Sequence, residues 1–536
     1  MPRHPLSRIK DAESLIELHE KLLFRRAYPR NRRELRQSET QIKQIASRVV
    51  ELRDSDVDLS PLDAPDVSGI AGTSVTSNFS YALVRWLVAK FPHQVSIDWD
   101  WFDSEDQFGA TMRRFLPLLE EDAMVEAHVP YQTWLDDARG RQNDVAWVIR
   151  QFEHSRLGDR QKAELYDSLK LHITWKLGSR SSRTGMRLPA RQTFFHDQPL
   201  IKRRDVSLID ELNSPPIPLA KLSRAEGEKI LDLARETSAV RYRELHGFTH
   251  GDPSRVVRAD LGRGTQAFVV GVPPEHRLPL RAYHAAIIFK NGVPVAYFEG
   301  LSLFERMESG FNLYYTFRNG ETAWLYARIL RLMRQLFGVI VFSIDPYQIG
   351  HENEEGIESG AFWFYRKLGF RPVKKELRKL TLAEEQKMAT QVGHRTSART
   401  LRKLAFGHML FDLRGEESNE WDRFEVRNIG LAVQRRMARD FGGDAQRMRI
   451  YASQKLEKSM GLRPSKNEIQ AKLFNDLLLA ASTAMNLAEW SPSERKAAAE
   501  IFLAKGAADE GGYLHKMQKH ALLRASLIKL GCGRGS

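Results

Sequence analysis

One stretch of the 536-residue chain, residues 311–370, constrains the fold most, because its hydrophobic period changes along it. Residues 311–317 are aromatic and extended in character, which predicts a strand. Arg318-Asn319-Gly320 is a turn signal. From Glu321 onward the apolar residues recur at helical spacing, and Gly338 predicts the C-terminus of that helix.

The second half of the stretch predicts another strand and another helix. Residues 339–344 form a short, β-branched and nearly continuous apolar run, which is typical of a buried strand. Residues 351–355 then read as an inserted loop, and residues 360–368 predict a short helix that Gly369 ends. The stretch therefore predicts strand, turn, long helix, strand, loop and short helix.

The residues before this stretch predict an antiparallel meander. A strand at 217–222 and a helix at 224–244 precede four further strands, expected at 256–261, 267–272, 283–290 and 293–300. Asn291-Gly292 between the last two strands is a strong hairpin signal, because both positions favour positive φ. The predicted centre of the chain is a mixed sheet that continues into the strand–helix–strand–helix unit.

This order of elements resembles the Gcn5-related N-acetyltransferase (GNAT) family over roughly residues 217–380. In the second helix of this unit the family often carries an alanine, two variable residues, an apolar residue, a tyrosine, two variable residues and Leu-Gly-Phe. Ala361-Phe362-Trp363-Phe364-Tyr365-Arg366-Lys367-Leu368-Gly369-Phe370 fits each place. Three residues before that alanine the family often has asparagine, and this chain has Glu358.

The resemblance implies an acyl-CoA-dependent N-acyltransferase, with acetyl-CoA or another acyl-CoA as co-substrate and an unknown amine as acceptor. The free N–H groups and the positive dipole end of a helix N-terminus suit a pyrophosphate. The implied cofactor-binding residues are Arg318, Asn319, Gly320, Glu321, Thr322 and Ala323. The family expects Gln or Arg at the first place of this turn, glycine at the fourth and Gly or Ala at the sixth. Counted from Arg318, the fourth place is Glu321, whose charge repels pyrophosphate, and the sixth is Ala323. Counted with Gly320 as the fourth place, the first is Phe317 and the sixth is Thr322.

Two residues are the expected catalytic groups. Tyr365 occupies the place of the family's general acid, where a phenol returns a proton to the departing thiolate. Glu299 is the expected general base, because it lies in an apolar strand where burial can bring its pKa towards neutrality; Glu305 and Glu308 are alternatives on the same strand pair. No metal site is expected.

The predicted fold class is α/β: a GNAT-like mixed-sheet domain flanked by mainly helical N-terminal and C-terminal regions. The expected divisions are a charged helical region at 1–60, a mainly helical domain at 61–204, the acyltransferase-like domain at 205–392 and an all-helical domain at 393–536. A chain of this length exceeds one ordinary core, which favours several domains.

Charge and composition leave two other function classes open. The net charge is +14, and the arginines between Arg25 and Arg36 form the densest basic cluster, so an anionic partner such as a nucleic acid is an alternative. The departure at Glu321 favours a catalytically inactive scaffold or binding protein instead. Cys532 is the single cysteine, which indicates the reducing cytoplasm, and no apolar run is long enough to predict a membrane span.

Overall fold

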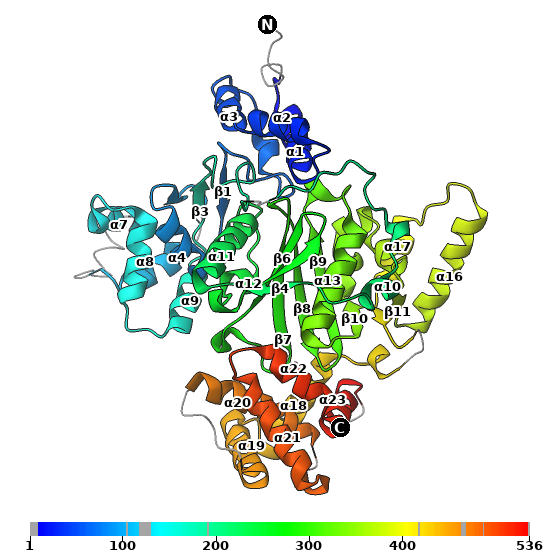
Figure 1. Cartoon of the computed structure of the whole chain (residues 1–536). Helices are drawn as coiled ribbons and strands as arrows, with labels where there is room; N and C mark the ends of the chain where they lie inside the picture. Colours follow the sequence, from blue (N-terminus) through cyan, green and yellow to red (C-terminus); the bar gives the residue numbers. More distant parts are fainter. Residues whose placement is uncertain are drawn as a thin grey trace.

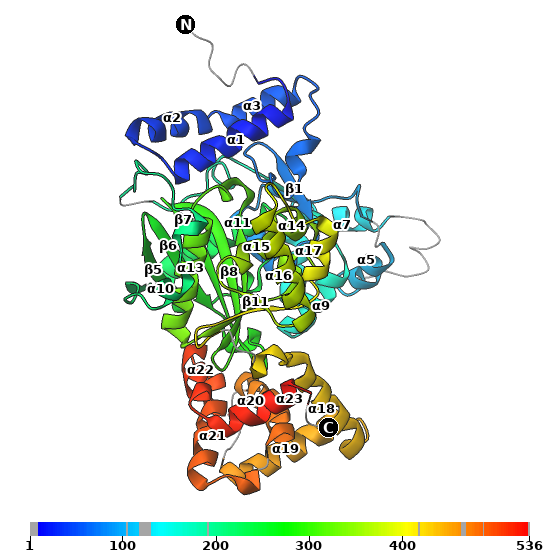
Figure 2. The ribbon, with the colours of Figure 1, turned by 90° about the vertical axis from the view of Figure 1, so that its right-hand side faces the viewer.

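The computed structural model describes residues 9–102, 105–116, 130–189, 192–415, 419–461, 468–485 and 487–533. A nine-stranded sheet lies at the centre of the molecule, with the N-terminal helices at one end and the C-terminal helices at the other (Figure 1, Figure 2). A three-stranded sheet with its own helices lies beside the large sheet. The predicted mixed α/β class is therefore confirmed.

The large sheet has the order β11-β12-β10-β9-β8-β7-β6-β5-β4. Its strands are β4 (Leu219–Lys221), β5 (Val257–Gly262), β6 (Thr265–Gly271), β7 (Ala282–Lys290), β8 (Val293–Leu303), β9 (Arg306–Leu313), β10 (Val341–Ile344), β11 (Arg371–Pro372) and β12 (Met409–Asp412). All neighbouring pairs are antiparallel except β9 and β10, which are parallel. The expectation that the strands on either side of the long helix share one sheet is confirmed.

The helices divide among the parts of the chain that the strands define. The N-terminal part and the small-sheet part contain α1 (Ala12–Ala27), α2 (Arg32–Ile42), α3 (Ile45–Arg53), α4 (Tyr81–Lys90), α5 (Glu105–Met112), α7 (Tyr131–Arg139), α8 (Asp144–His154) and α9 (Asp159–Ser168). The large sheet carries α10 (Leu208–Leu212), α11 (Arg224–Ala239), α12 (His246–Thr249), α13 (Thr322–Phe337), α14 (Glu354–Glu358), α15 (Ala361–Arg366), α16 (Lys375–Thr390) and α17 (Ala398–Leu404). The C-terminal helices are α18 (Val426–Phe441), α19 (Ala445–Met460), α20 (Glu468–Ala484), α21 (Pro492–Lys505), α22 (Glu510–Gln518) and α23 (Ala521–Gly531).

Turn chemistry fixes the central elements where the sequence predicts it. Asn291 and Gly292 join β7 to β8 with φ of 48° and 80°, a geometry that asparagine and glycine adopt readily. Gly338 ends α13 with φ of 68°, and its N–H donates to Arg334 O. The predicted hairpin and the predicted end of the long helix are both confirmed.

The two faces of the large sheet carry different helices. Adjacent residues of a strand point to opposite faces. On β7, His284 stacks on Phe337 of α13 with ring centroids 3.8 Å apart, whereas the hydroxyl of Tyr283 accepts a hydrogen bond from Gly247 N of α12. Helix α13 therefore covers one face, and α12 together with the neighbouring α11 covers the other.

The strand expected at 311–317 lies earlier in the chain. Strand β9 spans Arg306–Leu313, and the aromatic residues that follow form a short 3-10 helix, η6 (Tyr315–Phe317). The polar residues at the start of β9 form a strand because neighbouring strands pair with both of its edges there, so tertiary pairing overrides local propensity.

The C-terminal region is not all helical, which corrects the expected division at residue 393. Strand β12 belongs to the large sheet and lies between β10 and β11. Its four residues are all buried, and Leu410 pairs with Ser343 of β10 and with Arg371 of β11. Such a short apolar run cannot be distinguished from part of a helix by its period alone.

The small sheet has the order β1-β3-β2 and gives the second region a core of its own. Its strands are β1 (Ser74–Ser77), β2 (Val95–Ile97) and β3 (Ile173–Lys176). Trp175, Phe108 and Phe152 are buried there among a cluster of apolar side chains. A separate and larger core cluster runs from the N-terminal helices through the large sheet to the C-terminal helices.

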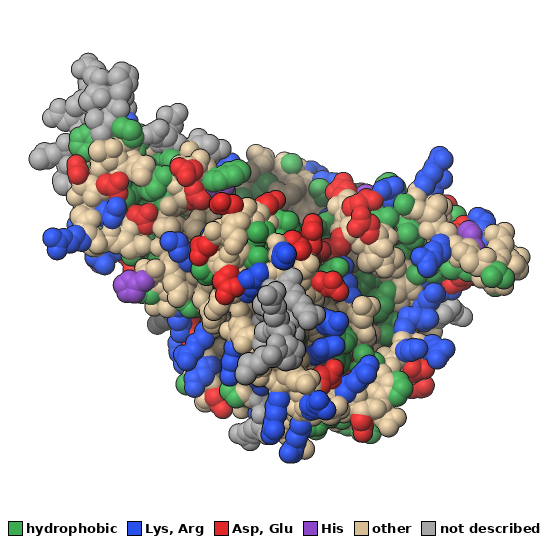
Figure 3. All heavy atoms as spheres, turned by 90° about the horizontal axis from the view of Figure 1, so that it is seen from above, with side chains coloured by type: hydrophobic (Ala, Val, Ile, Leu, Met, Phe, Trp, Pro, Cys, Tyr) green, Lys and Arg blue, Asp and Glu red, His purple; other side chains and the backbone are tan. Residues whose placement is uncertain are grey.

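On the face seen from above, Lys and Arg side chains are spread over a wide area, with acidic side chains among them (Figure 3). Of the arginines between Arg25 and Arg36, Arg26 is buried against Glu39, and Arg25 lies 3.6 Å from Glu34, whereas Arg30 is exposed. Among the described residues, no helix combines the length and the apolar character that crossing a bilayer requires.

Candidate functional site

A pocket of about 530 Å³ opens where β9 and β10 separate. It is lined by residues of β8 and β9, of the turn before α13, of the 346–360 segment and of α15. The lining residues are Arg243, Tyr297, Phe311, Asn312, Leu313, Arg318, Thr322, Tyr347, Gln348, Asn353, Glu355, Gly356, Ser359, Ala361, Phe364 and Tyr365. The inserted loop that the sequence indicates thus forms one wall.

The two parallel strands separate because β10 is short. Pairing between them ends at Ser343 and Glu308, and Pro346 follows the end of β10, whereas β9 continues to Leu313 along β8. The N–H of Tyr314 donates to Val295 O on the β8 side, so the alternation of the strand directs the backbone groups of Phe311 and Leu313 to the other side. An extended ligand lying there meets a strand edge that offers backbone hydrogen bonds.

Two of the six expected cofactor-binding residues line the pocket: Arg318 in the turn before α13, and Thr322, the first residue of that helix. Asn319 is exposed beside them, and Ala323 is buried in the first turn of the helix. The first intrahelical hydrogen bond of α13 runs from Leu325 N to Glu321 O. The N–H groups of the preceding helical residues therefore have no carbonyl of their own helix as partner, which is the arrangement that suits an anion.

Glu321 points away from the pocket into a buried ion cluster. Its carboxylate accepts hydrogen bonds from Arg263 Nη2 at 2.6 Å, Lys290 Nζ at 3.0 Å and Ile201 N at 3.2 Å, and the residue is 1% exposed. Burial acts to raise the pKa of Glu321, but Arg263 and Lys290 outweigh burial and lower it. The carboxylate is thus neutralised locally, so its expected repulsion of a pyrophosphate is absent; only its backbone lies at the turn.

The N-terminal helix α1 supports this turn from outside the pocket. A Cβ placed on Gly320 would lie 2.6 Å from Tyr28 Oη, which follows α1, so glycine permits this close approach. Glu20 of α1 accepts a hydrogen bond from Thr316 in η6 and forms a buried ion pair with Arg183. Burial acts to raise the pKa of Glu20, but Arg183 and neighbouring donors lower it to about 2.

Two guanidinium groups and one carboxylate set the charge of the pocket. Arg318 bonds to Glu355 of α14, whose other oxygen lies 4.0 Å from Arg243 Nη2. Arg243 also donates to Tyr297 Oη at 3.0 Å, and Asn312 Nδ2 donates to the same oxygen at 2.9 Å. Glu355 thus lies between the guanidinium groups of Arg318 and Arg243. An anionic group of a ligand bound at this place would interact with the same two guanidinium groups.

Tyr365 lies at the wall that α15 provides. It is 4% exposed and packs edge-on against Tyr326 and Phe370, with ring centroids 5.6 and 5.7 Å away. Burial raises the pKa of Tyr365 well above the ordinary value of a phenol, so the hydroxyl stays protonated into the alkaline range and is a weaker acid than a free phenol. The side chain can donate that proton to a group in the pocket.

Glu299 does not line the pocket. It pairs with Gly310 on β9, and its carboxylate accepts a hydrogen bond from Tyr283 Oη at 2.5 Å. Tyr297, two residues earlier on the same face of β8, takes the place at the pocket wall. The structure therefore does not bring the expected acid and the expected base into one cavity.

The alternative carboxylates also lie elsewhere. Glu305 accepts a hydrogen bond from Trp421 Nε1 at 3.0 Å and is bound by Arg524, so it joins β9 to the C-terminal helices. Glu308 lines a different cavity. The polar residues that the sequence analysis missed include Arg243, Tyr297 and Asn312. The alternation of β8 and β9 is the signal that places the last two on one face.

Comparison of the chain with models of known protein families, with curated proteins and with solved structures found no match. The geometry of the pocket and the resemblance of its residues to an acyltransferase motif are therefore the basis for a functional proposal.

Proposed function

We propose that the chain is a GNAT-like, acyl-CoA-dependent N-acyltransferase of the cytoplasm. The single observation that carries the proposal is the pocket between β9 and β10. It combines the turn before α13, an open strand edge and the protonated hydroxyl of Tyr365. These groups come from segments that the acyltransferase resemblance also selects.

Each part of the pocket suits one requirement of acyl transfer from a thioester. The helix N-terminus and Arg318 offer positive charge to a pyrophosphate. The strand edge at Phe311 and Leu313 offers hydrogen bonds to an extended, amide-containing arm. Tyr365 supplies a proton to the thiolate as it leaves. An amine approaching from the side of Tyr297 and Asn312 meets polar groups on the other face of the sheet.

A specific observation favours the second candidate, a binding protein without catalysis. Glu299 lies outside the pocket, and Glu355 occupies the space between Arg243 and Arg318. A protein that binds coenzyme A and transfers nothing would have this arrangement as well. Binding and turnover therefore have to be measured separately.

The first experiment measures binding of coenzyme A and acetyl-CoA by titration calorimetry and by thermal shift. Wild type is expected to bind both. Arg318→Ala is expected to weaken binding by roughly 10-fold or more, because charge-assisted hydrogen bonds contribute about 1.5–3 kcal/mol. Arg204→Ala is the matched control, since the Arg204 side chain is 75% exposed and does not line the pocket.

The second measurement follows thiol release from acetyl-CoA with a panel of amino acids, polyamines, amino sugars and lysine peptides. Turnover with any of them supports the acyltransferase. Binding without turnover across the panel supports the binding protein. If millimolar coenzyme A neither shifts the melting temperature nor gives a heat of binding, both candidates are wrong.

A further inference from the structure

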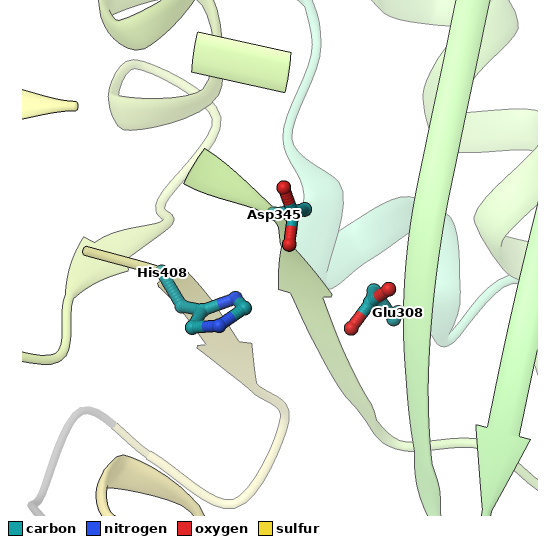
Figure 4. Close-up of side chains that lie close together, drawn as sticks. All are labelled: Glu308, Asp345 and His408. Carbon is teal, nitrogen blue, oxygen red and sulfur yellow. The ribbon is translucent and has the colours of Figure 1, made fainter. Parts of the chain in front are cut away.

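A second constellation of functional side chains lies on the large sheet, away from the pocket of Tyr365. Glu308 of β9, Asp345 at the end of β10 and His408 just before β12 come together from three neighbouring strands (Figure 4). One ligand atom from each residue lies within 4.8 Å of the other two. The sequence separates these residues widely, so only the strand order of the fold assembles them.

Strand register explains why the three side chains meet. Ser343 of β10 pairs with Glu308 in parallel register, and Ile344 pairs with Met409 in antiparallel register. One residue beyond the pair of Ile344 and Met409, Asp345 and His408 therefore lie opposite one another. The alternation of the strands places Glu308, Asp345 and His408 on the same face of the sheet, opposite to α13.

The hydrogen bonds of the three residues leave ligand atoms available. Asp345 Oδ1 caps η7 (Pro346–Ile349) by accepting from Tyr347 N at 2.9 Å, and this bond orients the carboxylate. His408 Nδ1 is buried and has no hydrogen-bond partner within the described part of the chain. Glu308 Oε1 forms an ion pair with Arg281 Nη1 at 3.6 Å, a separation longer than a hydrogen bond, so a metal ion would share this carboxylate with Arg281. A buried, unpartnered imidazole nitrogen is costly unless a ligand satisfies it.

The constellation opens onto a cavity of about 260 Å³. Three arginines line this cavity (Arg281, Arg306 and Arg427), and Glu425 lines it as well. Arg306 is held by Ser343 Oγ at 3.1 Å and Phe424 O at 3.2 Å, and Arg427 is paired with Glu425. The cavity shares none of its lining residues with the pocket that contains Tyr365.

We propose that Glu308, Asp345 and His408 bind a divalent transition-metal ion of the Zn²⁺ type, with its open coordination positions facing this cavity. One imidazole and two carboxylates form a mixed nitrogen and oxygen donor set, which suits Zn²⁺ and its neighbours better than Mg²⁺ or Ca²⁺. Three protein ligands leave at least one position for a further ligand. The surrounding arginines favour an anion at that position.

The charged groups that line the cavity balance one another before any metal ion is bound. The cavity lining carries three carboxylates and three guanidinium groups. A dication therefore adds an excess of positive charge that an anionic further ligand would offset. The site is independent of the proposed acyltransferase pocket, so either assignment can fail without the other.

The test uses the full-length protein after treatment with a chelator and dialysis. Zn²⁺ is titrated by calorimetry, and Co²⁺ is added as a spectroscopic probe whose visible absorption reports its coordination. We expect one tight site per chain and a rise in melting temperature on metal addition. Asp345→Asn and His408→Ala are each expected to weaken the affinity at least about 10-fold, since even residues that only support metal ligands contribute 10–100-fold.

The matched control is His250→Ala. His250 lies in the other histidine-rich part of the molecule, stacked on His276 with ring centroids 4.0 Å apart and close to His246. It is expected to leave the Zn²⁺ affinity and the Co²⁺ spectrum unchanged. Far-UV circular dichroism of each metal-free variant checks its fold; if His408→Ala is not folded, the near-isosteric Asp345→Asn decides.

Three outcomes would overturn the proposal. The first is a wild-type protein that binds neither Zn²⁺ nor Co²⁺ at micromolar concentrations. The second is Asp345→Asn with unchanged affinity and an unchanged Co²⁺ spectrum. The third is loss of the site in His250→Ala, which would assign the metal to the histidine cluster instead.

Discussion

In Tyr365 the aromatic ring packs in the core and the hydroxyl group is the proposed proton donor, so the two roles can be tested separately. The ring fills a buried place between Tyr326 and Phe370, and phenylalanine keeps that volume. Tyr365→Phe is therefore expected to preserve stability and coenzyme A affinity and to lower turnover by about 10²–10⁴-fold, the usual contribution of general acid catalysis. Thiol release under single-turnover conditions measures the effect on the chemical step.

The pH profile adds a second readout for Tyr365. Because burial raises its pKa, the phenol stays protonated through neutral and mildly alkaline pH, and the ratio of wild-type to variant rates is expected to be constant there. Tyr451→Phe is the control, since Tyr451 is 45% exposed on α19. Full single-turnover activity of Tyr365→Phe would remove its role as the acid.

The sequence predicted the place of Tyr365 better than that of the base. The Leu-Gly-Phe that ends at Phe370 fixes the position of Tyr365 on α15. The alternation of β8 predicts that Tyr297 and Glu299 share a face, but it does not predict where β10 ends. The position at which β10 ends decides whether Tyr297 or Glu299 lies at the pocket. That position depends on contacts between residues that are far apart in the sequence.

The turn between β9 and α13 is held by elements on both sides of it. Arg263 comes from the turn between β5 and β6, and Lys290 is the last residue of β7, yet both bind the carboxylate of Glu321 at the start of α13. Local sequence shows a glutamate at a helix N-terminus and nothing of these partners. The sequence therefore predicted the turn but not the direction in which the Glu321 side chain points.

Glu321→Gln is expected to destabilise the protein by about 3–5 kcal/mol, because it leaves buried Lys290 without a full countercharge. Urea unfolding near neutral pH measures the change, with Glu358→Gln as control, since Glu358 is exposed on α14. The pKa of folded Glu321 lies below 4.5, its ordinary value. The stabilisation of the folded protein by ionised Glu321 is therefore complete above about pH 4.5, and it is lost as the pH falls through the lowered pKa.

Acidification should accordingly bring the stabilities of wild type and Glu321→Gln closer together. Equal stability of the two proteins at neutral pH would contradict the role of the cluster. The same variant tests the link to the pocket: a displaced turn lowers coenzyme A affinity, and Glu358→Gln does not.

At the scale of the whole molecule, the C-terminal helices pack against the large sheet and form buried polar contacts with it. Lys505 and Glu510 make a fully buried ion pair, and Lys505 Nζ donates to Arg281 O beside β7. Arg277 donates to the carbonyl of Lys505 at 2.7 Å, and Glu510 accepts from Tyr283 N. The sequence predicted that this region is helical, but pairs so far apart along the chain are invisible to a local pattern.

Strand β12 provides the last prediction, because it determines where the chain can be cut. It lies between β10 and β11 and covers an edge of β10, whose residues are all buried.

Fragments 1–405 and 1–415 both contain α17 and both lack the C-terminal helices, so they differ only in the segment that includes β12. Without β12, β10 becomes an apolar edge strand, which promotes association between chains. Fragment 1–405 is therefore expected to aggregate at concentrations where 1–415 remains in solution, as sedimentation and light scattering can show. Equal solubility of the two fragments would mean that β12 does not protect β10, and the expected domain boundary near residue 392 would then be a workable one.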